Sequence, residues 1–160
     1  MLDDETQRLK QELKKRLELE LELPLTPKSS KQIEKAFNDS IILIDNYPII
    51  TINLLKIGDK TLHPFKDYLI NENDGTIYLN KNHTGLLYIE YIYGLKEEDY
   101  NPILELMLED ELDSGWNKNA TSISENDVSV SYDTSLGRGA LIQSMINDLK
   151  NRYKCHLEMI

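Results

Sequence analysis

The stretch that decides the fold runs from residue 41 to residue 94 and reads IILIDNYPIITINLLKIGDKTLHPFKDYLINENDGTIYLNKNHTGLLYIEYIYG. Short runs rich in Ile, Leu and Tyr are separated in it by Gly, Asn, Asp and Pro, which favour turns. Several short strands joined by tight turns are typical of an antiparallel meander or a small barrel. The expected strands are 41–44, 49–57, 61–62, 68–70, 76–79 and 86–93.

Turn residues indicate where these strands reverse direction. The Gly58-Asp59 pair follows the longest apolar run and predicts a two-residue hairpin turn. The Asn73-Asp74-Gly75 triplet predicts a second hairpin, which joins the strand at 68–70 to the strand at 76–79. We expect a further turn over 82–85, so that 76–79 and 86–93 are separate strands.

The residues before this stretch favour a helix followed by an extended arm. Leu9, Leu13 and Leu17 recur every four residues among charged residues, which predicts a helix with a narrow apolar stripe. From residue 17 to residue 25 leucine alternates with glutamate and then proline, which indicates an extended edge strand or arm. Leu and Glu are also good helix formers, so the sequence leaves a helix over 17–25 open.

A short helix is expected between the arm and the first strand. Ser29 and Gln32 have the spacing of a capping box, which predicts a helix from Ser30 to Phe37. The polar residues 38–40 would then end this helix, because Asn, Asp and Ser favour turns.

Two more helices and one strand are expected after residue 94. Asn101-Pro102 predicts the start of a helix with proline in its first position, and apolar residues continue at helical spacing to Leu112. Alternation from Val128 to Tyr132 predicts a short strand. A last helix is indicated by the spacing of Leu141, Ile142, Met145, Ile146 and Leu149.

Together these elements predict an α+β fold. It consists of a small antiparallel β-meander or partial barrel, flanked by an N-terminal helix and arm and by two later helices. The expected parts are a helix and arm over residues 1–27, an α+β core over 28–152 and a C-terminal tail over 153–160.

The chain is strongly acidic. Its 160 residues include 18 basic and 28 acidic ones, which gives a formal net charge of -10. An acidic surface repels phosphates, which argues against nucleic-acid binding and against docking on an anionic membrane. No stretch approaches the roughly 20 apolar residues of a membrane-spanning helix, and the first residues are acidic where a signal peptide is basic. We therefore expect a soluble protein made in the cytoplasm.

No catalytic or metal-binding group can be assembled from the sequence. The histidines, His63, His83 and His156, do not have the spacing of metal ligands. The single cysteine, Cys155, excludes an intrachain disulfide framework, and it lies near the wrong end of the last helix for an activated thiolate. Residues 135–139 lack the Lys-Ser/Thr pair of a phosphate-binding loop. We expect no catalytic residue, no metal and no cofactor, and therefore no enzyme.

Acidic residues are concentrated between residues 97 and 113, where eight acids occur without a base. Several of them share one side of the expected helix, which is typical of a solvated face. An acid–base pair for sugar chemistry would need a cleft that a chain with two Phe and one Trp is poorly equipped to build. The candidate acidic face consists of Glu105, Glu109, Asp110 and Glu111.

The order of these features resembles a known family. The residues that carry the resemblance are Tyr47-Pro48-Ile49-Ile50, the strand and turn at 52–60, Asp67-Tyr68-Leu69-Ile70, the hairpin strand at 74–79, the strand at 88–94, Pro102 and Ser129-Val130-Ser131-Tyr132. Over about 41–152 the chain resembles the head–tail connector proteins, also called head-completion or adaptor proteins, of long-tailed phages and related archaeal viruses and proviruses. The arm before Pro24 and the tail after Arg152 depart from the family pattern.

The resemblance implies a structural virion protein, made in the host cytoplasm, that joins the capsid portal to the tail. Members form a ring under the portal, usually of twelve subunits, and present a surface to the next tail or stopper protein, while an isolated chain can be a monomer. We expect the acidic face to line the lumen of such a ring, where it would repel passing DNA, or to meet the basic face of a neighbour. The candidate interface residues are those of the helix stripe and the two hairpin tips: Leu9, Leu13, Leu17, Gly58, Asp59, Asp74 and Gly75.

Other interpretations stay open. An acidic interaction protein that mimics DNA and binds a basic nucleic-acid-binding protein is the main alternative, and the net charge supports it. A tail or baseplate protein is a close variant of the connector interpretation that the sequence does not separate from it.

Overall fold

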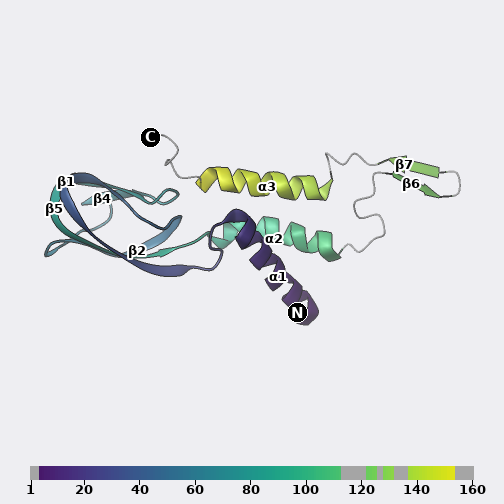
Figure 1. The fold of residues 1–160 in the computed structure, drawn as a ribbon, viewed down its shortest axis with the longest axis horizontal. Coiled ribbons are helices and arrows are strands. Elements are labelled where there is room, and N and C mark those ends of the chain that lie inside the picture. The colour runs from purple at the N-terminus through teal and green to yellow at the C-terminus, as the bar shows by residue number, and fades with distance from the viewer. Residues whose placement is uncertain (1–3, 113–121, 126–127, 132–136, 154–160) are drawn as a thin grey trace. The chain divides into compact units, whose positions relative to one another are not determined.

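The computed structural model describes residues 4–112, 122–125, 128–131 and 137–153. Its elements follow one another in the order α1, β1 to β5, α2, β6, β7 and α3 (Figure 1). The chain divides into two compact units: unit 1 comprises Met1–Glu22 and Glu97–Asn151, and unit 2 comprises Leu23–Lys96 and Arg152–Ile160. The fold is α+β with an antiparallel sheet, as predicted, and the sheet is open.

Unit 2 contains a five-stranded antiparallel sheet in which the last strand is central. The strands are β1 (Lys28–Leu43), β2 (Ile49–Ile57), β3 (Lys60–Thr61), β4 (Tyr68–Asn71) and β5 (Thr76–Tyr93). Their order is β1-β5-β2-β3, and β4 also pairs with β5. The long strand β5 therefore holds three other strands in register.

The inner face of this sheet forms the core of unit 2. The buried residues come from the strands and from the segments that connect them, and β2 and β5 contribute most. They are Ile42, Ile44, Ile49, Leu55, Ile57, Leu62, Tyr68, Ile77, Leu79, Leu87, Ile89 and Tyr91. Every member of this cluster lies in unit 2, so the sheet supplies its own core.

The helix predicted from Ser30 to Phe37 is wrong, because these residues belong to β1. Antiparallel pairing with β5 runs from Lys28 opposite Tyr93 to Ala36 opposite Gly85 and overrides the capping pattern. Gln32 does not cap a helix: its Nε2 donates to the carbonyl of Leu43 at 2.8 Å, and its Oε1 accepts from the backbone N–H of Asp45 at 3.0 Å.

These hydrogen bonds of Gln32 also show that β1 bends strongly. A straight strand would separate residues 32 and 43 by about 36 Å. The bend coincides with the shifts in register between Ala36 and Ile41, where Asn38 has a φ of 56°. The polar residues 38–40 thus form an irregularity inside a strand, and the bend lets the sheet curve around its inner face (Figure 1).

The turn predicted over 82–85 is also wrong, since β5 continues through it. Gly85 has a φ of +147°, and a Cβ at this position would lie 3.4 Å from the backbone nitrogen of Gly58. The glycine therefore marks a close approach of two backbones and not a chain reversal.

Both predicted hairpins are confirmed. Gly58 and Asp59 connect β2 to β3, with Ile57 opposite Lys60, and the φ of +59° at Gly58 suits the first position of a II′ turn. Residues 72–75 connect β4 to β5, with Asn71 opposite Thr76.

The described residues of unit 1 form helices and one hairpin. Helix α1 (Asp4–Leu21) contacts α2 (Glu97–Leu112), and α3 (Arg138–Tyr153) follows the hairpin of β6 (Ser122–Glu125) and β7 (Val128–Ser131). The last helix is confirmed, as is the strand expected near Val128.

Two helix boundaries differ from the predictions. Helix α1 continues to Leu21, because Leu13, Leu17 and Leu21 are all buried at a spacing of four residues, so the expected extended arm from residue 17 is wrong up to that point. Helix α2 begins at Glu97, and Pro102 lies inside it.

Some expectations fall outside the described residues. These are Asp113 at the end of the acidic stretch, Tyr132 of the expected strand, residues 135–136 of the expected turn, Cys155, His156 and the tail beyond Tyr153.

Candidate interaction surfaces

The leucine stripe predicted as an interface lies inside unit 1. Leu9 is half-buried, whereas Leu13 and Leu17 are buried in the unit in which α1 packs on α2. The second hairpin tip is also used internally, since the carbonyl of Gly75 accepts from the N–H of Ile44 at 2.9 Å. Gly58 and Asp59 are exposed.

The candidate acidic face is partly neutralised by α1. Glu105 pairs with Lys10, and Glu111 pairs with Arg16 at 3.4 Å. Asp110 is half-buried and Glu109 is exposed. The remaining negative charge is nevertheless concentrated here: α2 carries seven acidic and no basic residues, whereas residues 23–96 carry eight of each.

An open hollow of about 260 Å³ lies between α1 and α2. Two of its three charged lining residues have partners: Lys10 pairs with Glu105, and Lys14 Nζ lies 5.2 Å from the centre of the Tyr100 ring. Among the described residues, no group of three or more His, Cys, Asp or Glu side chains is arranged to hold a metal ion. None of the described helices has the length and apolar character needed to cross a membrane.

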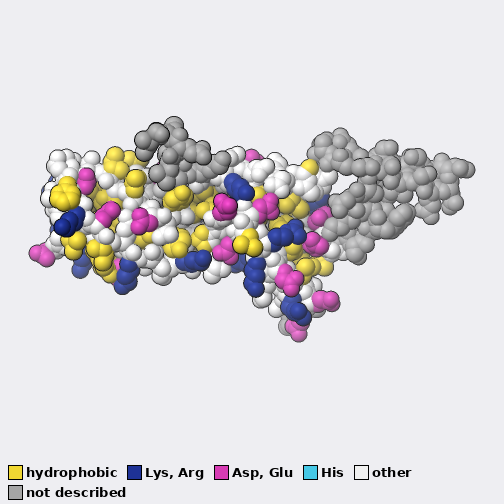
Figure 2. Space-filling view, in the orientation of Figure 1, with side chains coloured by type: hydrophobic (Ala, Val, Ile, Leu, Met, Phe, Trp, Pro, Cys, Tyr) yellow, Lys and Arg dark blue, Asp and Glu magenta, His cyan; other side chains and the backbone are white. Residues whose placement is uncertain are grey.

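The outer face of the sheet in unit 2 carries exposed apolar side chains. The register places Ile41 of β1, Tyr78 of β5 and Leu69 of β4 directly opposite one another, and all three are exposed. We call these three residues the outer row. Figure 2 shows hydrophobic side chains open to view over the strands of this unit. Further exposed apolar residues on β1 and β5 are Ile33, Phe37, Leu43 and Leu86.

A polar cluster lies on the same face, next to this apolar surface. Lys31 of β1 lies opposite Glu90 of β5, and its Nζ is 2.9 Å from a carboxylate oxygen of Glu90. The hydroxyl of Tyr88 donates to the same carboxylate. The hydrogen bond from Tyr88 and that from Lys31 hold the pKa of Glu90 below its usual value.

A second exposed surface is the loop of residues 62–67 between β3 and β4, which we call the Phe65 loop. Phe65 is 91% exposed, and its φ of 63° lies in the left-handed region that a bulky side chain rarely adopts. The N–H of Phe65 donates to the carbonyl of Tyr68 at 2.8 Å, and the N–H of Asp67 donates to the carbonyl of His63 at 2.9 Å. The loop is thus closed by its own backbone.

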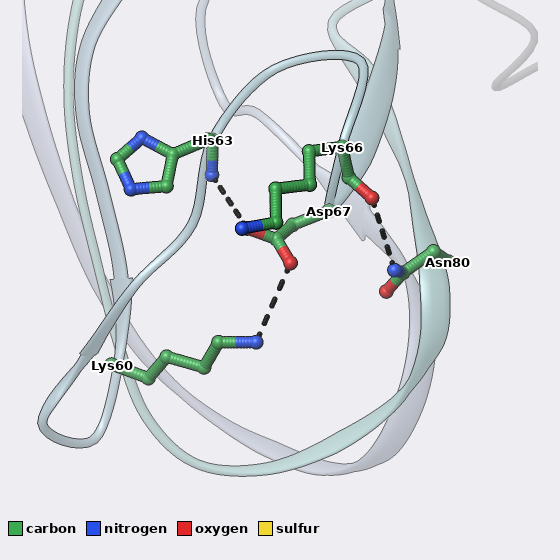
Figure 3. A network of polar contacts seen from close by, with 5 residues as sticks. All are labelled: Lys60, His63, Lys66, Asp67 and Asn80. Carbon is green, nitrogen blue, oxygen red and sulfur yellow. Dashed lines mark hydrogen bonds and ion pairs between the residues drawn. The ribbon is translucent and has the colours of Figure 1, made fainter.

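Side chains fix the Phe65 loop to the rest of the sheet, as Figure 3 shows. The buried carboxylate of Asp67 accepts from the N–H of His63 at 3.0 Å and lies 3.4 Å from Nζ of Lys60. The amide of Asn80 on β5 donates to the carbonyl of Lys66 at 3.1 Å. Five groups from β3, the loop and β5 therefore hold one conformation.

The surroundings of this network lower the pKa values of two side chains, Asp67 and His83. The hydrogen bond from the His63 N–H, followed by Lys60, holds the pKa of Asp67 below its usual value. Burial, followed by the charges of Lys60 and Lys81, lowers the pKa of His83, whose Nε2 has no hydrogen-bond partner among the described residues. Asp67 is thus held charged and His83 neutral near pH 7.

Sequence reasoning missed both the outer row and the Phe65 loop. The helix expected over Ser30 to Phe37 hid the long edge strand that carries part of the outer face. Phe65 stands between His63-Pro64 and Lys66-Asp67, and an aromatic residue enclosed by polar and turn residues could have indicated an exposed anchor.

Known proteins resemble this chain in structure and not in sequence. No protein-family model matches the chain, and no curated protein matches it. Among solved structures, the fold is similar to a chain in the neck of an empty GTA (gene transfer agent) particle determined with C6 symmetry. The two chains are 11% identical, the similarity covers 91% of this chain and 79% of that chain, and the TM-score is 0.45.

Proposed function

We propose that this chain is a structural virion protein of the head–tail connector class, which joins the portal of a long-tailed phage or related virus to the next tail component. It acts by assembling with copies of itself, as a ring of about twelve subunits, and with the proteins on either side. The observation that carries the proposal is the exposed outer row on a sheet whose long edge strand, β1, pairs only with β5 in the described part of the chain.

Such a surface is costly for a protein that works alone. Contiguous exposed apolar side chains mark sites of protein association, and a long edge strand offers unpaired backbone groups to another chain. In an assembled ring, neighbouring subunits would cover both. The resemblance of residues 41–152 to connector proteins supports the virion setting.

The acidic face supports the DNA-mimic alternative less well. A mimic presents carboxylates spaced like phosphates, free to meet a basic protein. In α2, Glu105 and Glu111 are already paired with Lys10 and Arg16 of α1. The acidic face of Glu105, Glu109, Asp110 and Glu111 remains a candidate for the wall of a ring lumen or for contact with the basic face of a neighbouring subunit.

The experiment is assembly of the full chain with the portal protein encoded in the same genome. Sedimentation velocity over a range of concentrations and negative-stain images should show rings, alone or bound to the portal. A variant with Ile41→Ser and Leu69→Ser should stay folded, because both side chains are exposed, and should assemble less well. A chain that never associates with itself or the portal, and that binds basic nucleic-acid-binding proteins in a salt-sensitive way, contradicts the proposal.

A further inference from the structure

We infer that the Phe65 loop is a preformed docking tip, with Phe65 as its anchor, and that it binds helix α2 of a second copy of this chain. The inference rests on the proposed function, because it names a contact through which copies would assemble.

The first step is the conformation of Phe65. A bulky residue with positive φ is strained, and such strain persists where the surroundings over-determine the backbone and is concentrated at functional sites. Within the monomer Phe65 buries little surface that could offset this strain, since 91% of the residue is exposed. A large aromatic side chain held outward is the type of residue that dominates binding at protein interfaces.

The second step is the rigidity of the loop. Asp67 binds the His63 N–H and Lys60, and Asn80 holds the carbonyl of Lys66 (Figure 3). Because these contacts exist before any partner arrives, little conformational entropy is lost when Phe65 is inserted into a partner. The tip is therefore ordered before binding, as a preformed binding element requires.

The third step is the charge around the anchor. Lys66 follows Phe65 in the sequence. Lys81 follows Asn80, whose side chain is hydrogen-bonded to the loop. Both lysines are exposed, and neither has an ion-pair partner among the described residues. The tip thus carries an exposed aromatic ring with exposed lysines in the loop and on the adjoining strand β5, and the charge of Lys66 also acts on the Asp67 carboxylate. This combination fits an apolar surface with carboxylates around it.

The chain itself offers such a surface on α2. Glu109 and Leu112 are three residues apart and share one side of the helix. Glu109 is exposed, and Leu112 is 53% exposed. Helix α2 has seven acidic residues and no basic one, so its charge is opposite to that of the tip. The sheet segment around the tip has equal numbers of acidic and basic residues.

The contact joins two different surfaces, so it is heterologous. Repeated from copy to copy, a heterologous contact closes into a ring when its rotation allows. This is the kind of interface that a ring of identical subunits needs.

The test compares three variants with the wild-type chain by sedimentation equilibrium and by negative-stain images with the portal. Phe65→Gly should weaken self-association about tenfold or more, as expected for the loss of an interface anchor. The tip-reversed variant (Lys66→Glu, Lys81→Glu) and the helix-reversed variant (Glu109→Lys, Leu112→Lys) should each fail to associate alone. Mixed in equal amounts, the two reversed variants should associate again, because each surface then meets its opposite charge. Leu141→Ala, which removes an exposed leucine from α3, is the matched control and should change nothing.

The outcomes separate this inference from the proposed function. Rings of Phe65→Gly with wild-type affinity, or a mixture that associates no better than its components, overturn the inference and leave the proposed function intact. If Phe65→Gly loses portal binding while its self-association is unchanged, the Phe65 loop binds the portal and not a second copy of this chain, which overturns the inference. A wild-type chain that assembles neither alone nor on the portal overturns both.

Discussion

At Phe65 the backbone adopts a strained left-handed conformation, and the side chain buries almost none of its surface. Relief of that strain is worth about 1–2 kcal/mol, and the greater freedom of glycine in the unfolded chain takes back about 0.4–1 kcal/mol. Phe65→Gly should therefore stabilise the monomer by about 0–1.6 kcal/mol. Urea unfolding at concentrations below self-association measures this change.

A loss of stability in that variant would contradict the assignment, because it would mean that Phe65 makes contacts within the monomer. Higher stability combined with weaker assembly would show instead that the strain is retained for binding. Leu69→Gly is a useful comparison: it also removes an exposed apolar side chain, but from a regular strand, and should destabilise the monomer.

Asp67 gives the protein a predictable dependence on pH. The pKa of its carboxyl is lowered from an ordinary value of 3.8, so the folded state binds the proton more weakly than the unfolded state. The stabilisation from the charged form is fully present above pH 3.8 and is lost as the pH falls through the lower folded-state pKa. Unfolding should therefore become easier below about pH 4.

Asp67→Asn tests this assignment. The variant should be less stable than the wild type at pH 7. The difference should shrink as the pH falls below 3.8, because the carboxyl of the unfolded wild type is protonated first, while that of the folded state keeps its charge down to its lower pKa. Thermal unfolding between pH 3 and pH 7 provides the comparison. A difference that stays constant over this range would show that the charge of Asp67 is not the stabilising feature.

Among the elements, α1 carries the leucine stripe that the sequence predicts as an interface. Leu17 of this stripe is fully buried in the chain itself. Truncation of a buried leucine costs about 2–5 kcal/mol. Leu17→Ala should therefore reduce the helical signal of the monomer and its thermal stability, even at concentrations where no assembly forms.

The control for that prediction is Leu19→Ala. Leu19 lies on the same helix but is 80% exposed, so its truncation should leave stability within about 0.5 kcal/mol of the wild type. Equal and small effects of the two substitutions in the monomer would return Leu17 to the role of an interface residue.

Local patterns predicted the elements whose signal is complete within a few residues. The Gly58-Asp59 turn is an example, because only a few residue types suit the dihedral angles of a two-residue hairpin. The last helix is another, since its buried residues Ile142, Ile146 and Leu149 repeat at helical spacing.

Non-local pairing decided the elements that were missed. Residues 28–37 form a strand because β5 lies beside them, and the partner residues are more than 45 positions away in the chain. The same pairing carries β5 through 82–85 without a turn. A capping pattern at Ser29 and Gln32 contains no information on such a partner, so tertiary context overrides it. The Phe65 loop was missed for a related reason, because Asn80 is brought to it only by the sheet.

At the scale of the whole molecule, charge is divided unevenly between the two units. The sheet segment 23–96 has equal numbers of acidic and basic residues, and α2 alone carries seven of the acids. The net charge of -10 therefore describes unit 1 more than the protein as a whole. A chain with a neutral, partly apolar sheet segment and an acidic unit 1 can present surfaces of different chemistry to different neighbours.

The separation into units leads to a last prediction: residues 23–96 should fold without the rest of the chain. Every residue of the sheet core lies within this segment, and its ends meet where the N–H of Leu95 donates to the carbonyl of Pro24 at 2.8 Å. Since the free energy of unfolding is about 0.05–0.15 kcal/mol per residue, the fragment should unfold cooperatively but with low stability. Circular dichroism should report strand structure that melts in one transition, and Ile89→Ala, which removes a fully buried side chain, should abolish it. A fragment without a cooperative transition would show that the sheet depends on the helical unit, and the two units would then have to be treated as a single folding domain.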